Sequence, residues 1–188
     1  MKFLTWPRAN LFCYHLKNSY SIHMNTYDIF LVPTASQTIE YNQLIATLAN
    51  DYKTPSFLHV TILEKVEANE QELIAKVASL AQDFNEIEVD LFGVNFTNTT
   101  HQCVFAQIKM SAPLLTLYEG LAANLQFSNK APFFPHMSLI YGDFSPEAKA
   151  TIAGQVKVGN RLLLDKLIIY RDGPLATDWQ QVAEFELK

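Results

Sequence analysis

The chain is organised around two short stretches, Phe57-Leu-His59-Val-Thr61-Ile-Leu63 and Phe134-Pro-His136-Met-Ser138-Leu-Ile140. Each is an apolar run with β-branched or aromatic residues, which is typical of a strand. Side chains alternate along a strand, so each histidine shares a face with the hydroxyl residue two positions later. The intervening residues are apolar, and we expect that opposite face to pack against a core. Each strand therefore presents a titratable base beside a hydroxyl.

The elements predicted around the two motifs occur in the same order in both halves of the chain. The first half is predicted to contain a strand over 27–33, a helix from Ser36 or Thr38 to Asn50, the first histidine strand, a helix over 70–84 and a strand over 87–92. The first helix is expected to bury Ile39, Leu44, Ile45 and Leu48, and Asn69 is expected to cap the second. The second half is predicted to contain a strand over 102–108, a helix over 113–127, the second histidine strand, a helix over 145–153 and strands over 162–170 and 179–187.

This repeated order predicts two lobes of like architecture with a cleft between them. We expect residues 25–188 to form one bilobal domain, with lobes of about 25–100 and 101–188 and with room for strands to be exchanged between them. Residues 1–24 show no periodicity and are predicted to be a flexible extension.

Composition limits the classes of function. With 188 residues, 49% of them hydrophobic, the chain suits a single globular domain. A formal net charge of −5 argues against a stable complex with long nucleic acids, which need a basic surface. Cys13 and Cys103 form no C-x-x-C motif, and no apolar run reaches the length of a membrane span. We therefore expect a cytoplasmic, monomeric protein with no membrane partner.

Two imidazoles that face one substrate can divide an acid–base reaction, one deprotonating water and the other protonating a leaving oxygen. The hydroxyls of Thr61 and Ser138 can donate hydrogen bonds to a phosphoryl group whose charge develops in the transition state. Metal ligation by His59 and His136 is the competing chemistry, but neither strand supplies the carboxylate or third histidine that it would want. We expect neither a metal nor another cofactor.

The paired H-x-[ST] motifs resemble those of the two-histidine (2H) phosphoesterases. The run Pro135-His-Met-Ser138-Leu-Ile-Tyr141-Gly-Asp is most similar to the second motif of the plant and yeast cyclic phosphodiesterases, and the resemblance spans about residues 25–188. It implies an α+β fold of two pseudo-symmetric lobes of antiparallel sheet, with helices outside and a central cleft. It also implies hydrolysis of ADP-ribose 1″,2″-cyclic phosphate and of nucleoside 2′,3′-cyclic phosphates to 2′-phosphates, so the expected partner is a small cyclic nucleotide.

The resemblance also assigns roles to individual residues. It implies that His59 and His136 form the acid–base pair, and family analogy favours His136 as the base. It places Thr61, Ser138 and Tyr141 at the phosphate, although simple alternation puts Tyr141 on the face opposite Ser138 unless the strand bends near Gly142. By the same resemblance Phe30 stacks on the base, and Phe105 is a candidate for the other wall of that site.

The remaining candidates have weaker support from the sequence. His101 is predicted to lie at an exposed turn. Trp179 is a candidate either to line the cleft or to cover the second sheet, and we favour the covering role. Lys130 and Arg171 are candidates for the positive field around a phosphate, and Glu64 for orienting a group near the first motif.

Two other functions stay open. One is an RNA-end-processing enzyme of the same superfamily, which trims oligonucleotides or joins 2′–5′ linkages, although the acidic net charge counts against it. The other is a nucleotide-binding module without catalysis, which would retain the aromatic residues and lose a histidine.

Overall fold

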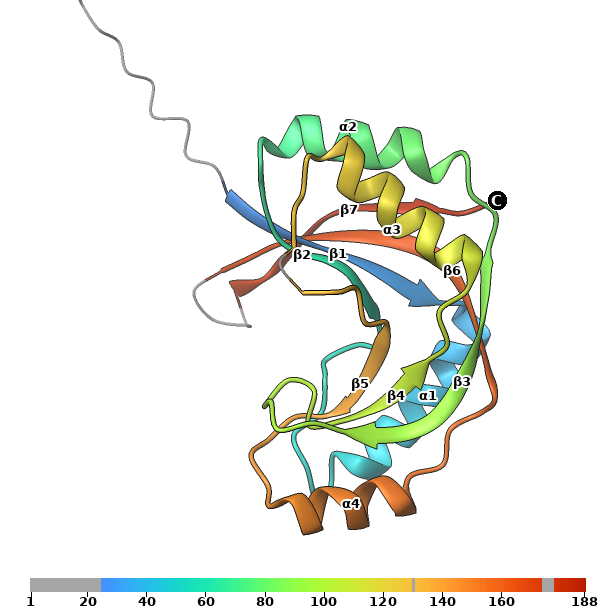
Figure 1. Ribbon diagram of the computed structural model, residues 1–188, viewed down its shortest axis with the longest axis vertical. Helices are drawn as coiled ribbons and strands as arrows, with labels where there is room; N and C mark the ends of the chain where they lie inside the picture. Colours follow the sequence, from blue (N-terminus) through green and yellow to red (C-terminus); the bar gives the residue numbers. More distant parts are fainter. Residues whose placement is uncertain (1–24, 130, 174–177) are drawn as a thin grey trace, which may run out of the picture.

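The computed structural model describes residues 25–129, 131–173 and 178–188 (Figure 1). The predictions for residues 1–24 and for Lys130 lie outside these ranges. Seven strands and four helices follow one another in the described residues: β1 (Asn25–Pro33), α1 (Ala35–Leu48), β2 (Val60–Ala68), α2 (Glu70–Ala81), β3 (Ile87–Phe96), β4 (Val104–Ile108), α3 (Ala112–Asn124), β5 (His136–Ile140), α4 (Pro146–Gln155), β6 (Arg161–Arg171) and β7 (Gln180–Glu186). None of these helices is long and apolar enough to cross a membrane.

The seven strands form one antiparallel sheet in the order β1-β2-β5-β4-β3-β6-β7, and β1 also pairs with β6. Figure 1 shows this sheet bent into two groups of strands that face each other across an opening, β7-β6-β1-β2 above and β5-β4-β3 below. The helices lie outside, α2 and α3 on the upper group and α1 and α4 near the lower one. The predicted α+β fold with two lobes, outer helices and a central cleft is confirmed.

The strands of the two sequence halves are interleaved in the sheet. β3, from the first half, pairs with β4 and with residues 161–164 of β6. β6 then continues along β1, from Leu164 to Arg171, so one long strand belongs to both groups. β2 and β5, which carry the two motifs, pair side by side where the groups meet.

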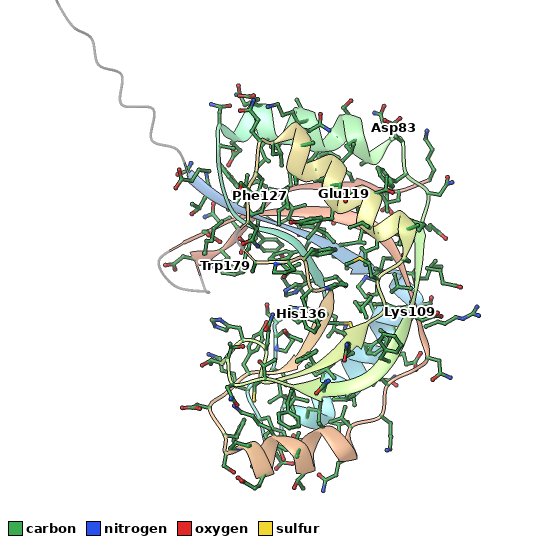
Figure 2. All side chains as sticks on the ribbon, viewed as in Figure 1. Asp83, Lys109, Glu119, Phe127, His136 and Trp179 are labelled. Carbon is green, nitrogen blue, oxygen red and sulfur yellow. The ribbon has the colours of Figure 1, made fainter. Side chains whose placement is uncertain are left out.

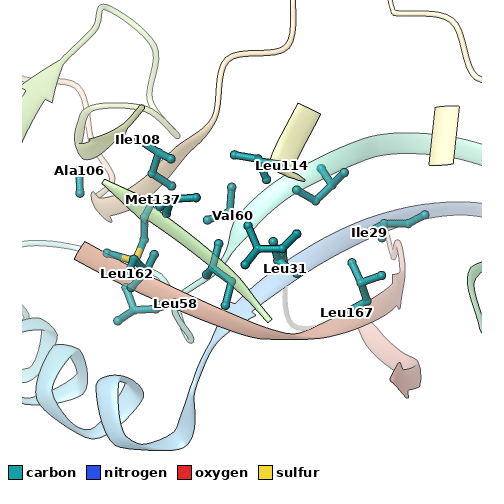
Figure 3. Close-up of a cluster of buried hydrophobic side chains, with 14 of the residues drawn as sticks. Ile29, Leu31, Leu58, Val60, Ala106, Ile108, Leu114, Met137, Leu162 and Leu167 are labelled. Atoms are coloured by element: carbon teal, nitrogen blue, oxygen red, sulfur yellow. The ribbon is translucent and has the colours of Figure 1, made fainter. Parts of the chain in front are cut away.

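The apolar faces of the motif strands lie in the core. Leu58, Val60 and Met137 are at most 2% exposed, and Figure 3 shows them among buried leucines and isoleucines of β1, β4 and β6. This confirms the predicted orientation of both strands. Burial on one face fixes the register, because a slip of one residue would turn all of these side chains outward.

The boundaries of the first helix and of the first motif strand differ from the prediction. α1 starts after Thr34, whose carbonyl accepts the first helical hydrogen bond from Thr38 N at 2.8 Å, so neither Ser36 nor Thr38 is its cap. Its inward stripe begins at Tyr41 and continues at the helical spacing through residues 44, 45 and 48, which leaves Ile39 off the stripe and 64% exposed. β2 begins at Val60, so His59 directly precedes the strand.

The other predicted helix starts are correct in position. Asn69 accepts a hydrogen bond from Glu72 N and caps α2, and Ser145 accepts one from Ala148 N and caps α4. Ser111 caps α3, with a proline in the first turn where its missing N–H costs nothing.

Candidate active site

The pairing of β2 with β5 brings the two motifs together. Val60 lies opposite Met137 in this antiparallel pair. The same register places His59 across from Ser138 and Thr61 across from His136, and all four side chains share the face opposite the core. Figure 2 shows His136 at the inner end of the opening between the two groups of strands. The two H-x-[ST] motifs therefore form one site in the cleft, related by a local two-fold axis.

Both motif histidines are held in the same way. His59 Nδ1 lies 3.1 Å from the carbonyl oxygen of Phe57, and His136 Nδ1 lies 2.9 Å from that of Phe134. A carbonyl oxygen only accepts, so Nδ1 carries the proton in each ring and donates it. The other nitrogen, Nε2, then keeps its lone pair and can exchange a proton with a substrate or water.

The electrostatic setting favours neutral imidazoles. Burial lowers the pKa of His59 to about 4, and the nearby His136 adds to that effect. Burial also lowers the pKa of His136, which the carboxylate of Glu64 partly opposes. At neutral pH both rings can accept a proton.

Tyr141 reaches the Ser138 hydroxyl because β5 contains a β-bulge. Phe105 of β4 pairs with Ser138 but Val104 pairs with Ile140, so β5 carries one extra residue between them. The extra residue reverses the alternation and turns Tyr141 to the side of Ser138. Burial raises the pKa of Tyr141, and a hydrogen bond with Ser138 opposes this shift.

Ser138 and its neighbours form a connected hydroxyl cluster. Ser138 Oγ donates to the backbone oxygen of His101 at 2.8 Å, and the His101 ring meets the Tyr141 ring edge to face at 5.5 Å. His101 is exposed, as expected, but it lies beside the site. A turn between β3 and β4 therefore contributes backbone to the Ser138 side of the site, which the sequence did not indicate.

Phe30 and Phe105 lie beside the motifs. Phe30 pairs with Thr61, and Phe105 with Ser138, across neighbouring strands. Their rings lie 4.2 Å from the His59 ring and 5.4 Å from the His136 ring, centroid to centroid. They are only 2% and 1% exposed, and each contacts one motif histidine. Their predicted stacking on a base stays a prediction.

Other aromatic rings present more surface at the cleft. Trp179 stacks on Phe30 at 6.4 Å, and Tyr170 stacks on Phe57 at 5.1 Å. Trp179 lies at the edge of the upper strands, facing the opening in which His136 lies (Figure 2). The expected role of Trp179 was to cover a sheet, but the structure places it beside Phe30 at the mouth of the site. On the other side Phe134, 44% exposed, stacks on His136.

Arg171, a candidate for the positive field around a phosphate, is engaged elsewhere. Its guanidinium lies 3.3 Å from Glu70 Oε2 and also binds Gln180, at the far end of β6. Lys65 lies closer to the site, over the Trp179 ring at 5.7 Å, while it pairs with Asp172. Within the described residues no group of three or more histidine, cysteine or acidic side chains is arranged to hold a metal ion.

Two surface hollows lie away from this cleft. One, of about 310 Å³, lies between β3 and the start of α3 and is lined by Glu88, Asp90, Lys109, Met110 and Ser111. The other, of about 300 Å³, lies between α1 and α4. Neither is lined by a histidine.

Comparisons with known proteins agree with this geometry. Residues 24–185 match the family model described as cyclic phosphodiesterase-like protein. A cyclic phosphodiesterase of Arabidopsis thaliana is 20% identical over 129 residues, covering 68% of this chain and 71% of that protein.

Solved structures share the fold. TT0787 of Thermus thermophilus has a TM-score of 0.64 at 16% identity, over 86% of this chain and 97% of that one. Escherichia coli LigT, solved in complex with 3′-AMP, has a TM-score of 0.59 at 13% identity, over 88% of this chain and 99% of that one. The chain thus belongs to the cyclic phosphodiesterase-like protein family and is a phosphodiesterase of the two-histidine superfamily.

Proposed function

We propose that this phosphodiesterase hydrolyses ADP-ribose 1″,2″-cyclic phosphate and nucleoside 2′,3′-cyclic phosphates, without a metal ion, by acid–base catalysis between His59 and His136. The observation that carries this proposal is the mirrored pair of histidines, each fixed through Nδ1 by a backbone carbonyl two residues earlier. A cyclic phosphodiester needs one proton removed from water and one delivered to the leaving oxygen, and two such rings supply both.

The proposed reaction is an in-line displacement at phosphorus. One imidazole Nε2 takes a proton from water as the water oxygen bonds to phosphorus. The P–O3′ bond of a 2′,3′-cyclic nucleotide breaks, and the other imidazole, which enters the step as an imidazolium protonated at Nε2, gives that proton to O3′, which leaves a 2′-phosphate. Thr61 donates to one non-bridging oxygen. The Ser138 hydroxyl, which donates to the backbone oxygen of His101 in the structure, turns to donate to another, and the Tyr141 hydroxyl beside it is a further donor.

The aromatic rings at the mouth of the cleft suit a nucleoside substrate. Trp179 and Tyr170 on one side and Phe134 on the other border the histidines. A base can stack on such rings whatever its identity, which fits a substrate group that includes all four nucleosides. The formal net charge of −5 fits a substrate with a single phosphodiester charge rather than a long polyanion.

Hydrolysis in excess EDTA tests the proposal directly. The purified protein is given ADP-ribose 1″,2″-cyclic phosphate, the four nucleoside 2′,3′-cyclic phosphates and a short RNA that ends in a 2′,3′-cyclic phosphate. We expect turnover of the small esters to 1″- or 2′-phosphates. Activity confined to the RNA would replace the proposal with RNA-end processing, and no activity on any of them would replace it with a nucleotide-binding module.

A further inference from the structure

Glu64 occupies the position in the first half of the site that Tyr141 occupies in the second. Phe30 pairs with Thr61 but Ile29 pairs with Leu63, so β2 carries one extra residue, the counterpart of the bulge in β5. The bulge turns Glu64 to the side of Thr61, as the bulge in β5 turns Tyr141 to the side of Ser138.

This position directs the charge of Glu64 at one of the two histidines. Thr61 lies across from His136 in the register of β2 and β5, so a side chain beside Thr61 is on the His136 side of the site. The Glu64 carboxylate raises the pKa of His136 and opposes the effect of burial. His59, by contrast, feels the charge of His136, which adds to the effect of burial and lowers the pKa of His59 further.

The other charged or titratable groups that face His136 do not reproduce this effect. β4 contains no charged residue, and the second-half neighbours Tyr141 and His101 carry no negative charge at neutral pH. The adjacent cation, Lys65, pairs with Asp172 at the end of β6. Among the residues that the structure describes, Glu64 is thus the carboxylate that distinguishes the two halves of an otherwise mirrored site.

We propose that Glu64 is a positioning residue that stabilises the protonated form of His136 and so makes His136 the general acid and His59 the general base. This assignment rests on the proposed hydrolysis, and it reverses the role that family analogy gives to His136. The reason is physical: in a symmetric pair either imidazole can hold the proton, and a carboxylate on one side breaks that symmetry.

Imidazole titration by NMR tests the proposal without any reliance on turnover. We expect the pKa of His136 to fall in Glu64→Gln, to be retained in Glu64→Asp, and to be unchanged in Glu67→Gln. Glu67 is a matched control because it lies exposed on the same strand, opposite Thr26. An unchanged pKa of His136 in Glu64→Gln, or an equal fall in the pKa of His59, would overturn the proposal even if the protein hydrolyses cyclic phosphates.

The pH–rate profile tests the assignment of roles. A general acid must be protonated to act, so in Glu64→Gln we expect the alkaline limb of the profile to move to lower pH. Turnover on that limb should fall about two- to fivefold, which is the size expected for the loss of one exposed charge pair. The acidic limb, which reports the base His59, should stay in place. A shift of the acidic limb with a fixed alkaline limb would reverse the two roles. If no substrate is turned over, the hydrolysis proposal fails while the NMR titration still decides the electrostatic one.

Discussion

Phe30 and Phe105 hold the same place in the two halves of the sheet. Each lies opposite the hydroxyl residue of one motif, and the ring of each contacts the histidine of that motif while remaining at most 2% exposed. Each imidazole contacts one of these rings, and the backbone hydrogen bond at Nδ1 fixes its tautomer. The site is therefore preorganised by elements that the two halves share.

Loss of either motif histidine should abolish most of the turnover. We expect His59→Ala and His136→Ala each to lower kcat by at least ~100-fold, since general acid–base groups contribute ~10²–10⁴-fold. Thr61→Ala and Ser138→Ala should have smaller effects, because each removes one of several donors. Steady-state rates with 2′,3′-cyclic AMP measure this, with circular dichroism to show that each variant is folded. Near-native kcat in either histidine variant would disprove the paired-imidazole mechanism.

The pKa of His59 also predicts a pH dependence of stability. An unfolded histidine titrates near ~6.5, whereas burial lowers the pKa of His59 to about 4 in the folded protein. Between these values the unfolded chain binds the proton and the folded protein does not, so the stabilising contribution is complete above ~6.5 and is lost as pH falls toward 4. The loss in the free energy of unfolding amounts to at most ~3 kcal/mol.

Urea unfolding at pH 7 and at pH 4.5 measures this loss in the wild type and in His59→Gln, which does not titrate. The comparison is needed because Asp28, whose pKa burial raises to about 6, opposes the trend over part of the same range. We expect the wild type to lose more stability between the two pH values than the variant. Equal losses would show that His59 titrates normally in the folded protein.

The sequence predicts the site better than it predicts the surroundings of the site. Alternation and apolar burial are local properties, so the faces of both motif strands and the pairing of histidine with hydroxyl could be predicted from residues 57–63 and 134–140. The bulges could not, because an extra residue shows only against its partner strand. For that reason simple alternation misplaced Tyr141 and left Glu64 unplaced.

Contacts between distant segments also could not be predicted from the sequence. Trp179 reaches Phe30 because β7 pairs with β6 and β6 pairs with β1, a chain of registers that no local pattern contains. Ile39 was misassigned for a simpler reason. It lies two positions before Tyr41, and the inward stripe of α1 follows Tyr41 at the helical spacing.

Met137 should be essential for stability, since it is fully buried where β2 meets β5. Met137→Ala would leave a cavity between the motif strands, and we expect a loss of ~2–5 kcal/mol in the free energy of unfolding. Met110→Ala is the matched control: Met110 is 38% exposed, and its truncation should change stability by ~0.5 kcal/mol or less. Equal effects of the two substitutions in urea unfolding would contradict the packing described for this junction.

Trp179 should contribute to substrate binding rather than to the chemical step. Its ring stacks on Phe30 at the mouth of the cleft, and stacking of a base on an aromatic ring is worth ~1–3 kcal/mol. We therefore expect Trp179→Ala to raise KM for 2′,3′-cyclic AMP by ~5-fold or more while kcat stays within ~2-fold. Trp179→Phe should retain most of the affinity.

A base-free substrate, ribose 1,2-cyclic phosphate, separates stacking from a general disturbance of the site. Its KM should be nearly the same in the wild type and in Trp179→Ala, because it has no ring to stack. If Trp179→Ala raised KM for both substrates equally, the tryptophan would be supporting Phe30 and the His59 side of the cleft instead of contacting the base.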